Sequence, residues 1–442
     1  MKNKFELLFI TLGLLSLLGG LFFGVVASLQ FVFPDFLQSI PFYKTRPLHV
    51  SLVVAWIFLA SIGGIYYYIP SQFGIKLYSK TMSVLHFIVF LITGIVIIIA
   101  YLMGKFGGRE YWEFPPILAI PIIISWLLFG WNYFKTAFKI TSEWPVYMWM
   151  WATGILFFLF TFSEAYVWML PKIKENVIKE IAMQWKAYGA LVGSWNMLVY
   201  GTAIFLMEKI KNDKSIGKSK IAFLAYFLGL TNLMFGWAHH IYNVPTAQWI
   251  RYVAYIISMT ELILLAKIIY NWKKSVQESL KDFHVLPFKF LVASDVWIFL
   301  NLTLALMLSV PIINVYTHGT HITVAHAMGS TIGINTMILL ASCLFLIDNY
   351  IQSKYSKIEL KLIKIGYYAF NISLLIFWSS LIIAGIIKGV GIVKNGKGFQ
   401  EVMNDIQPVM SVFSISGILL FLSLLMILLP PLKKSIRFLF NK

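Results

Sequence analysis

Long apolar runs dominate this chain and leave it few folds to adopt. Leu7 to Phe33 contains no charged residue, and it is longer than the roughly 20 apolar residues that a helix needs to cross a bilayer. Similar runs recur along all 442 residues, of which 59% are hydrophobic and only 12% charged. Backbone polar groups must be satisfied internally in hydrocarbon, and runs of this length do so as helices. The sequence therefore predicts an all-α integral membrane protein.

Short polar loops separate the runs, and no internal repeat or long linker divides them. We therefore expect a single polytopic membrane domain, residues 1-442, with about twelve transmembrane helices. The expected spans are 8 to 33, 47 to 69, 82 to 104, 116 to 138, 145 to 171, 187 to 208, 221 to 242, 248 to 272, 288 to 312, 320 to 347, 365 to 387 and 408 to 431.

The distribution of basic residues predicts the orientation of the chain. About two thirds of the 36 Lys and Arg residues fall on the side of the N-terminus, which the positive-inside rule places in the cytoplasm. An even number of helices returns the C-terminus to that side, so both termini are expected to be cytoplasmic. The formal net charge of +18 is thereby explained without a nucleic-acid partner.

Histidines gather on one side of the predicted membrane. Six of the eight lie toward the outer ends of spans, namely His49, His239, His240, His318, His321 and His326. His86 and His284 lie toward the inner side. Neutral imidazole is a ligand for iron, copper and zinc, and histidines on different helices suit haem ligation. The grouping predicts a haem or metal site, whereas a transporter would show repeats and broken helices near the midplane.

The segments around these histidines resemble the haem-copper oxidase superfamily, and within it the catalytic subunit of cytochrome-c-type nitric oxide reductase. Pro41 to His49 resembles the second helix of that family, whose histidine ligates a low-spin haem. Gly108 to Pro115 resembles an outer-face motif of nitric oxide reductases. The resemblance implies that Glu110 lies near a bridging calcium ion and Glu113 near the active site.

Two later segments extend the resemblance. Gly236 to Tyr242 is similar to the segment that supplies two histidines, here His239 and His240, to a non-haem iron or copper. Glu261 falls where the family has an active-site carboxylate. Tyr316 to His326 resembles the start of the haem-ligating tenth helix, which makes His326 the expected ligand of a high-spin haem b.

Two departures from the family pattern bear on function. The family has a second histidine two residues after the first on the tenth helix, where this chain has Met328. A thioether can be an axial ligand and generally raises the potential of a haem iron, so His49 and Met328 are a candidate pair for a low-spin haem b. Met328 is equally a candidate for core packing.

The second departure is on the sixth helix, which in the family gives the non-haem metal a histidine and a glutamate. Residues 185 to 196 contain neither residue type, and Tyr188 stands at the histidine position. Tyr188 and Asn196 are the candidate oxygen ligands for the metal, although a structural role is an alternative for each. Two histidines alone would make a weak, open site.

Three kinds of function are compatible with the sequence. The resemblance implies reduction of nitric oxide to nitrous oxide, with Glu113 and Glu261 as proton carriers. The missing ligands favour instead a non-catalytic electron-transfer or gas-sensing subunit. Oxygen reduction or nitric oxide dismutation would use the same scaffold.

An electron donor is expected in every case. Cys343 is the only cysteine, so the chain has no covalent c-type haem attachment site. The resemblance implies a membrane-anchored cytochrome c subunit as partner, with a quinol as the alternative donor. It also implies a prokaryotic cell membrane and a small gas as substrate.

Overall fold

The computed structural model describes residues 4–263, 266, 267, 282 and 285–440, and its regular elements there are all helical. Eleven helical segments in the described part are long and apolar enough to cross a membrane. The main helices are α1 (Phe5–Val32), α2 (Phe42–Phe73), α3 (Lys80–Leu102), α4 (Ala119–Ala137), α5 (Val146–Glu164), α7 (Val177–Lys211), α8 (Lys220–Phe235), α9 (Gln248–Met259), α11 (Leu286–Leu308), α14 (Met337–Ile351), α15 (Lys357–Val393) and α16 (Phe399–Phe440). Shorter elements are α6 (Pro171–Lys174), α12 (Pro311–Thr317), α13 (His321–Met328) and two irregular helices, η4 (Gly236–Ile241) and η5 (Gly329–Thr336).

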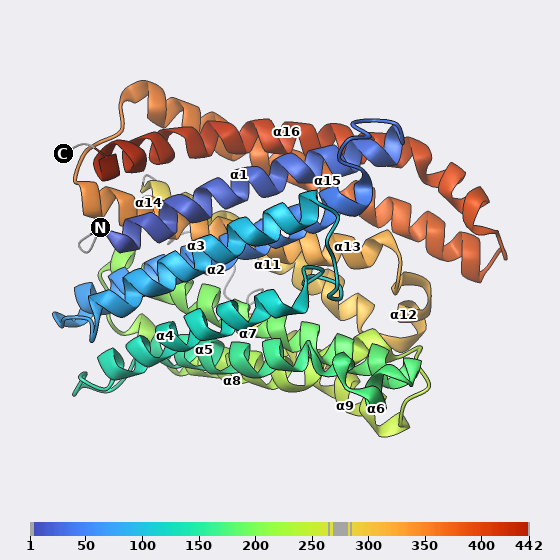
Figure 1. Cartoon of the computed structure of the whole chain (residues 1–442), viewed down its shortest axis with the longest axis horizontal. Coiled ribbons are helices and arrows are strands. Elements are labelled where there is room, and N and C mark those ends of the chain that lie inside the picture. The colour runs from blue at the N-terminus through green and yellow to red at the C-terminus, as the bar shows by residue number, and fades with distance from the viewer. Residues whose placement is uncertain (1–3, 264–265, 268–281, 283–284, 441–442) are drawn as a thin grey trace.

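The expected all-α membrane fold is confirmed. Eleven of the twelve expected spans have a counterpart among these helices. The remaining one, 248 to 272, begins with α9 and continues into residues that lie outside the described part. Both termini lie at the same end of the bundle (Figure 1), as an even number of crossings requires. The side of the membrane that holds them stays a prediction.

Several helices extend beyond the spans expected from hydropathy. α15 begins at Lys357, whereas its expected span begins at 365. Its first turn is stabilised by a capping box, in which Ser356 accepts from the backbone of Glu359 and Glu359 accepts from the backbone of Ser356. Such caps satisfy the first backbone N–H groups in water. The start of α15 is therefore set by its capping residues, and it lies outside the apolar span that hydropathy predicts.

One composite helix occupies the centre of the bundle. It consists of α13, η5 and α14, and 83% of its apolar window is buried, against 28% for α3. η5 is a π-helix, a form that occurs mostly as short segments at functional sites. Gly333 allows α11 to approach η5, because a Cβ there would lie 2.6 Å from the Trp297 ring. On another side, Trp56 Nε1 on α2 donates to Thr336 Oγ1 at 3.1 Å.

Candidate functional site

A small cavity lies at the end of the bundle opposite the two termini, which we call the distal end. Its walls come from η4, α11, α12 and α13 and include four histidines, His239, His240, His318 and His326. The other lining residues are Ala305, Leu308, Asn314, Thr317 and Thr323. The cavity measures about 10 Å³, about the minimum for one water molecule. A single metal ion fits this volume, whereas a porphyrin requires the walls to separate.

The paired histidines owe their position to a change of helix type. The α-helix ends at Phe235, and Gly236 opens the tighter turn of η4. A Cβ on Gly236 would overlap Asn232 Oδ1, so a larger residue there would displace the Asn232 side chain. On η4 the rings of His239 and His240 have centroids 4.2 Å apart. The Trp185 ring of α7 stacks on His240 at 4.6 Å, with the ring planes 4° apart.

The other two histidines come from the start of the central helix. Asn314, 3% exposed on α12, donates Nδ2 to the carbonyl of His239 at 3.3 Å. This bond ties α12 to η4. His318 follows α12, and Gly319 then adopts a φ of +73°, which glycine tolerates and which turns the chain into α13. His326, five residues after the start of α13 at His321, also lines the cavity.

Each of the four histidines has a buried ring nitrogen without a hydrogen-bond partner in the described part of the chain. These atoms are Nδ1 of His239, His240 and His326 and Nε2 of His318. A buried polar atom left unpaired costs about 1–3 kcal/mol. Burial also lowers the pKa of His318, which favours the neutral form of its ring. Neutral imidazoles facing one cavity are the donor set that iron, copper or zinc takes.

The donors fit a metal or a haem chemically, but their side chains are not converged on one point. No three His, Cys, Asp or Glu side chains in the described ranges form a preassembled metal cluster. The centroids of His240 and His318 are 6.1 Å apart, more than those of His239 and His240.

The remaining histidines lie elsewhere. His321 begins α13 but does not line the cavity. His86 is buried in α3 toward the other end of the bundle, where its Nδ1 lies 3.2 Å from Tyr66 Oη and its ring stacks on Phe129. His284 lies outside the described residues.

His49 stands on α2, away from the cavity. Its Nδ1 lies 2.7 Å from the carbonyl oxygen of Gly20 on α1, and its ring packs against Gly24. This contact leaves Nε2 as the ring atom available to a metal. Met328 ends α13, half-buried against the main core and directly before the π-helix. The hydrogen bond from Trp56 to Thr336 joins α2, which carries His49, to the π-helix that directly follows Met328.

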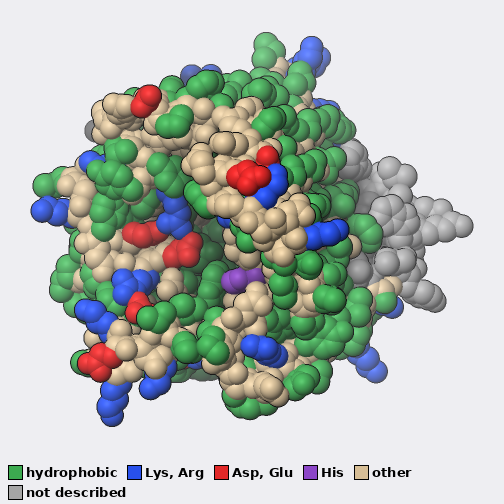
Figure 2. All heavy atoms as spheres, turned by 90° about the vertical axis from the view of Figure 1, so that its right-hand side faces the viewer, with side chains coloured by type: hydrophobic (Ala, Val, Ile, Leu, Met, Phe, Trp, Pro, Cys, Tyr) green, Lys and Arg blue, Asp and Glu red, His purple; other side chains and the backbone are tan. Residues whose placement is uncertain are grey.

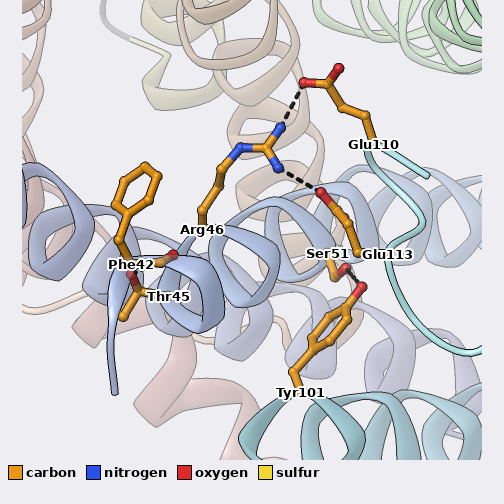
Figure 3. A network of polar contacts seen from close by, with 7 residues as sticks. All are labelled: Phe42, Thr45, Arg46, Ser51, Tyr101, Glu110 and Glu113. Carbon is orange, nitrogen blue, oxygen red and sulfur yellow. Dashed lines mark hydrogen bonds and ion pairs between the residues drawn. The ribbon is translucent and has the colours of Figure 1, made fainter. Parts of the chain in front are cut away.

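The predicted Glu110 and Glu113 meet at Arg46, next to the N-terminal turn of α2 (Figure 3). Arg46 Nη2 donates to Glu110 Oε1 at 2.6 Å, and Nη1 donates to Glu113 Oε1 at 2.7 Å. The Glu110 side chain is 42% exposed and that of Glu113 14%. Burial raises the pKa of Glu113, and the charge of Arg46 only partly opposes this shift.

The two carboxylates do not form a calcium site by themselves. Calcium takes 6–8 oxygen ligands, whereas one oxygen of each glutamate already accepts a hydrogen bond from Arg46. A second ion pair lies nearby, where Arg109 Nε donates to Glu180 at 2.7 Å and the guanidinium packs over the Trp168 ring. Charged side chains also surround a hollow on the distal face in which a histidine is visible (Figure 2).

Three other predicted site residues lie outside the cavity wall. Glu261 follows α9, and its Oε1 accepts a hydrogen bond from Asn232 on α8, one turn before η4. Asn196 Oδ1 accepts from Asn335 Nδ2 at 3.0 Å, which joins α7 to the π-helix. The Tyr188 ring packs edge-on against Tyr111 at 5.3 Å, and its buried hydroxyl has no partner among the described residues.

Two residues that build the site are not among those that the sequence predicts for it, Trp185 and Asn314. A buried amide in an apolar segment is a signal for a tertiary hydrogen bond, so Asn314 is detectable in principle. The stacking of Trp185 depends on the relative placement of α7 and η4, which no local pattern gives.

Comparisons with known proteins agree with this geometry. The family described as "Cytochrome C and Quinol oxidase polypeptide I" matches residues 4–419. Among curated proteins, the chain is similar to a subunit of the nitric oxide reductase of Stutzerimonas stutzeri. The two are 26% identical over 357 residues, which cover 74% of this chain and 71% of the relative.

A solved structure shares the fold. It is a haem-copper terminal oxidase dimer determined by cryo-electron microscopy, with a TM-score of 0.79 and 14% sequence identity. The match covers 98% of this chain and 84% of the oxidase chain. At this identity the likeness concerns the arrangement of helices alone.

Proposed function

Because this chain belongs to the cytochrome c and quinol oxidase polypeptide I family, we propose that it is a membrane oxidoreductase that reduces nitric oxide to nitrous oxide. The observation that carries the proposal is the distal cavity, in which four histidines present buried, unpartnered ring nitrogens. The similarity to the nitric oxide reductase of Stutzerimonas stutzeri supports this substrate over oxygen.

His326 would hold a high-spin haem b, and His239 and His240 a non-haem iron or copper. When bound, these groups supply the binding positions and electrons for two molecules of nitric oxide. The balanced reaction takes two electrons and two protons and yields one nitrous oxide and one water. Tyr188 and Asn196 have no role at the metal in this function, because neither lines the cavity. Calcium has none either, because Glu110 and Glu113 alone offer too few oxygen ligands for it.

Protons would come from the distal face. Glu113 is mostly buried there, with one oxygen on Arg46 and the other without a partner in the described part of the chain. Its pKa is raised by burial, so this carboxyl holds a proton more readily than an ordinary glutamate, as a proton carrier requires. Glu261, tied to the helix that carries the paired histidines, is the second proposed carrier.

His49 and Met328 would hold a low-spin haem b, which would supply electron transfer toward the cavity. The donor would be a partner subunit, a membrane-anchored cytochrome c by analogy with the relative, whose name marks it as one subunit of a complex. A non-catalytic haem subunit is the second candidate. The observation in its favour is that α7 contributes no histidine or carboxylate to the cavity.

The test is to count haems and measure turnover in the purified chain and in His326→Ala. We expect two b-type haems in the parent by pyridine haemochrome assay, one in the variant, and nitrous oxide production only in the parent. Two haems without turnover would favour the non-catalytic subunit. A parent without haem would overturn the redox function altogether.

A further inference from the structure

We propose that the first turns of α15 form a binding site for an anionic phospholipid. The site lies at the end of the bundle that holds both termini, which we call the proximal end (Figure 1). A groove of about 420 Å³ runs along the helix there, a volume in the range of small-molecule sites. Its lining residues in the described part of the chain are Lys357, Leu360, Lys361, Lys364, Ile365 and Tyr368. The groove and the distal cavity lie at opposite ends of the bundle, so the inference does not depend on the proposed function.

Three lysines of the groove share one face of the helix. Lys357, Lys361 and Lys364 are spaced four and three residues apart, which makes their side chains neighbours on the helix surface. None of the three makes an ion pair or a side-chain hydrogen bond with another described residue. Like charges at this spacing destabilise a helix. An anion bound between the lysines would relieve the repulsion.

Other charged groups at the proximal end already have partners. Lys434 Nζ donates to Asp348 Oδ1 at 2.8 Å, and Lys4 Nζ donates to the carbonyl of Phe438 at 2.6 Å. Glu359 is the carboxylate nearest to the three lysines in sequence, but it accepts from the backbone N–H that precedes the helix, at 2.8 Å. The positive-inside rule explains why lysines gather at this end. It does not explain why three of them line one groove without a counter-charge.

The depth of the lysines matches that of lipid headgroups. Hydropathy predicts that the apolar span of this helix begins at residue 365. At a rise of about 1.5 Å per residue, Lys364 and Lys361 lie ~1.5 and ~6 Å outside that boundary. The headgroup region is roughly 5–8 Å thick on each side of the hydrocarbon core. Helical side chains tilt toward the N-terminus, which here leads away from the hydrocarbon, so the ammonium groups reach the level of the phosphates.

The same face of the helix continues into the membrane as an apolar stripe. Ile365, Tyr368, Ile372 and Leu375 keep the spacing of three and four residues, and all four are exposed. A phospholipid would place its phosphate among the lysines and its acyl chains along this stripe, whereas a soluble phosphate would leave the stripe unused. The proximal end is predicted to face the cytoplasm, where the leaflet carries anionic lipids and basic grooves bind their headgroups. We therefore assign the groove to an anionic phospholipid.

The first test measures lipid binding by native mass spectrometry of the purified full chain in a neutral detergent. The probes are cardiolipin, phosphatidylglycerol and, as the neutral lipid, phosphatidylcholine. The α15 variant carries Lys357→Gln, Lys361→Gln and Lys364→Gln. A matched control removes the same charge from exposed lysines between α7 and α8, by Lys214→Gln, Lys218→Gln and Lys220→Gln. We expect the affinity for the anionic lipids to fall at least about tenfold in the α15 variant and to stay unchanged in the control.

A second test locates the lipid. Phosphatidylglycerol with a photoreactive acyl chain should label residues between Ile365 and Leu375 in the parent and in the control, but not in the α15 variant. Haem content should be equal in all three proteins, because the groove is far from the distal cavity. Unchanged affinity in the α15 variant, an equal loss in the control, or equal labelling by phosphatidylcholine would overturn the site. Displacement of the lipid by inorganic phosphate alone would overturn the assignment to a phospholipid and indicate a soluble phosphate as the ligand.

Discussion

His49 and the cavity histidines present their rings in different ways. The His49 ring is oriented by the Gly20 carbonyl, 2.7 Å from Nδ1, and by close packing against Gly24. Among the cavity histidines, backbone carbonyls lie within reach of His239, at Gly236, and of His326, at Asn301. The buried Nδ1 of His240 and Nε2 of His318 have no acceptor in the described part of the chain. Metal-ligating histidines usually have their second ring nitrogen bonded to a carbonyl or carboxylate, which fixes the tautomer and the ring orientation.

The difference indicates two degrees of preorganisation. On the proposed function, His49 would present Nε2 before any cofactor binds, because its Nδ1 already faces the Gly20 carbonyl. The rings of His239 and His240 would take their final orientation only with the metal. The two regions nevertheless share the central helix, because His326 and Met328 are two residues apart on α13. Substitutions can still alter one region at a time.

The largest effect is expected at Met328. If His49 and Met328 hold a low-spin haem as proposed, Met328→His replaces a thioether ligand with an imidazole. We then expect the midpoint potential of that haem to fall by roughly 0.1 V, a fraction of the ~0.8 V range that axial ligands span. Redox titration of the optical spectrum measures this shift. Met328→Leu keeps the packing volume and should remove the low-spin spectrum. A low-spin spectrum that survives Met328→Leu would show that the thioether is core packing.

A smaller effect is expected from Gly24→Ala, which acts on the orientation of His49. The added Cβ would lie 2.7 Å from His49 Nδ1, so the ring must move away from the Gly20 carbonyl. Overpacking of this kind costs about 1–3 kcal/mol, and we expect a lower thermal midpoint together with a shifted low-spin absorption band. The high-spin haem should keep its spectrum.

The matched control is Gly94→Ala on α3, where nothing lies within 4 Å of the new Cβ. Alanine is favoured over glycine in a helix by up to about 1 kcal/mol, so this variant should be as stable as the parent or more so. Equal spectra for both variants would mean that the His49 ring is not held by its neighbours.

Some features of the fold and of the candidate site could be predicted from the sequence, and others could not. Spans and the grouping of histidines follow from hydropathy and residue type, which are local properties. The pairing of Arg46 with Glu110 and Glu113 joins residues 64 and 67 positions apart. The π-helix after Met328 likewise contacts Trp297 and Trp56, which come from other helices. Such contacts are set by the packing of whole helices. The resemblance to the family identified the segments that form the candidate site. It could not predict the hydrogen bond from Asn314 to the carbonyl of His239.

The smallest expected effect concerns the protonation of Glu113 on the distal face. Burial raises the pKa of this carboxyl above its ordinary value of about 4.3, so the folded state binds the proton more tightly than the unfolded chain. The free energy of unfolding should therefore fall as pH rises from the ordinary to the raised pKa. Infrared titration should show a protonated carboxyl band above pH ~4.3 that is absent from Glu113→Gln. Because the guanidinium of Arg46 opposes the shift, Arg46→Gln should move the midpoint of that band to higher pH. A midpoint that stays in place or falls would show that Arg46 does not control this proton.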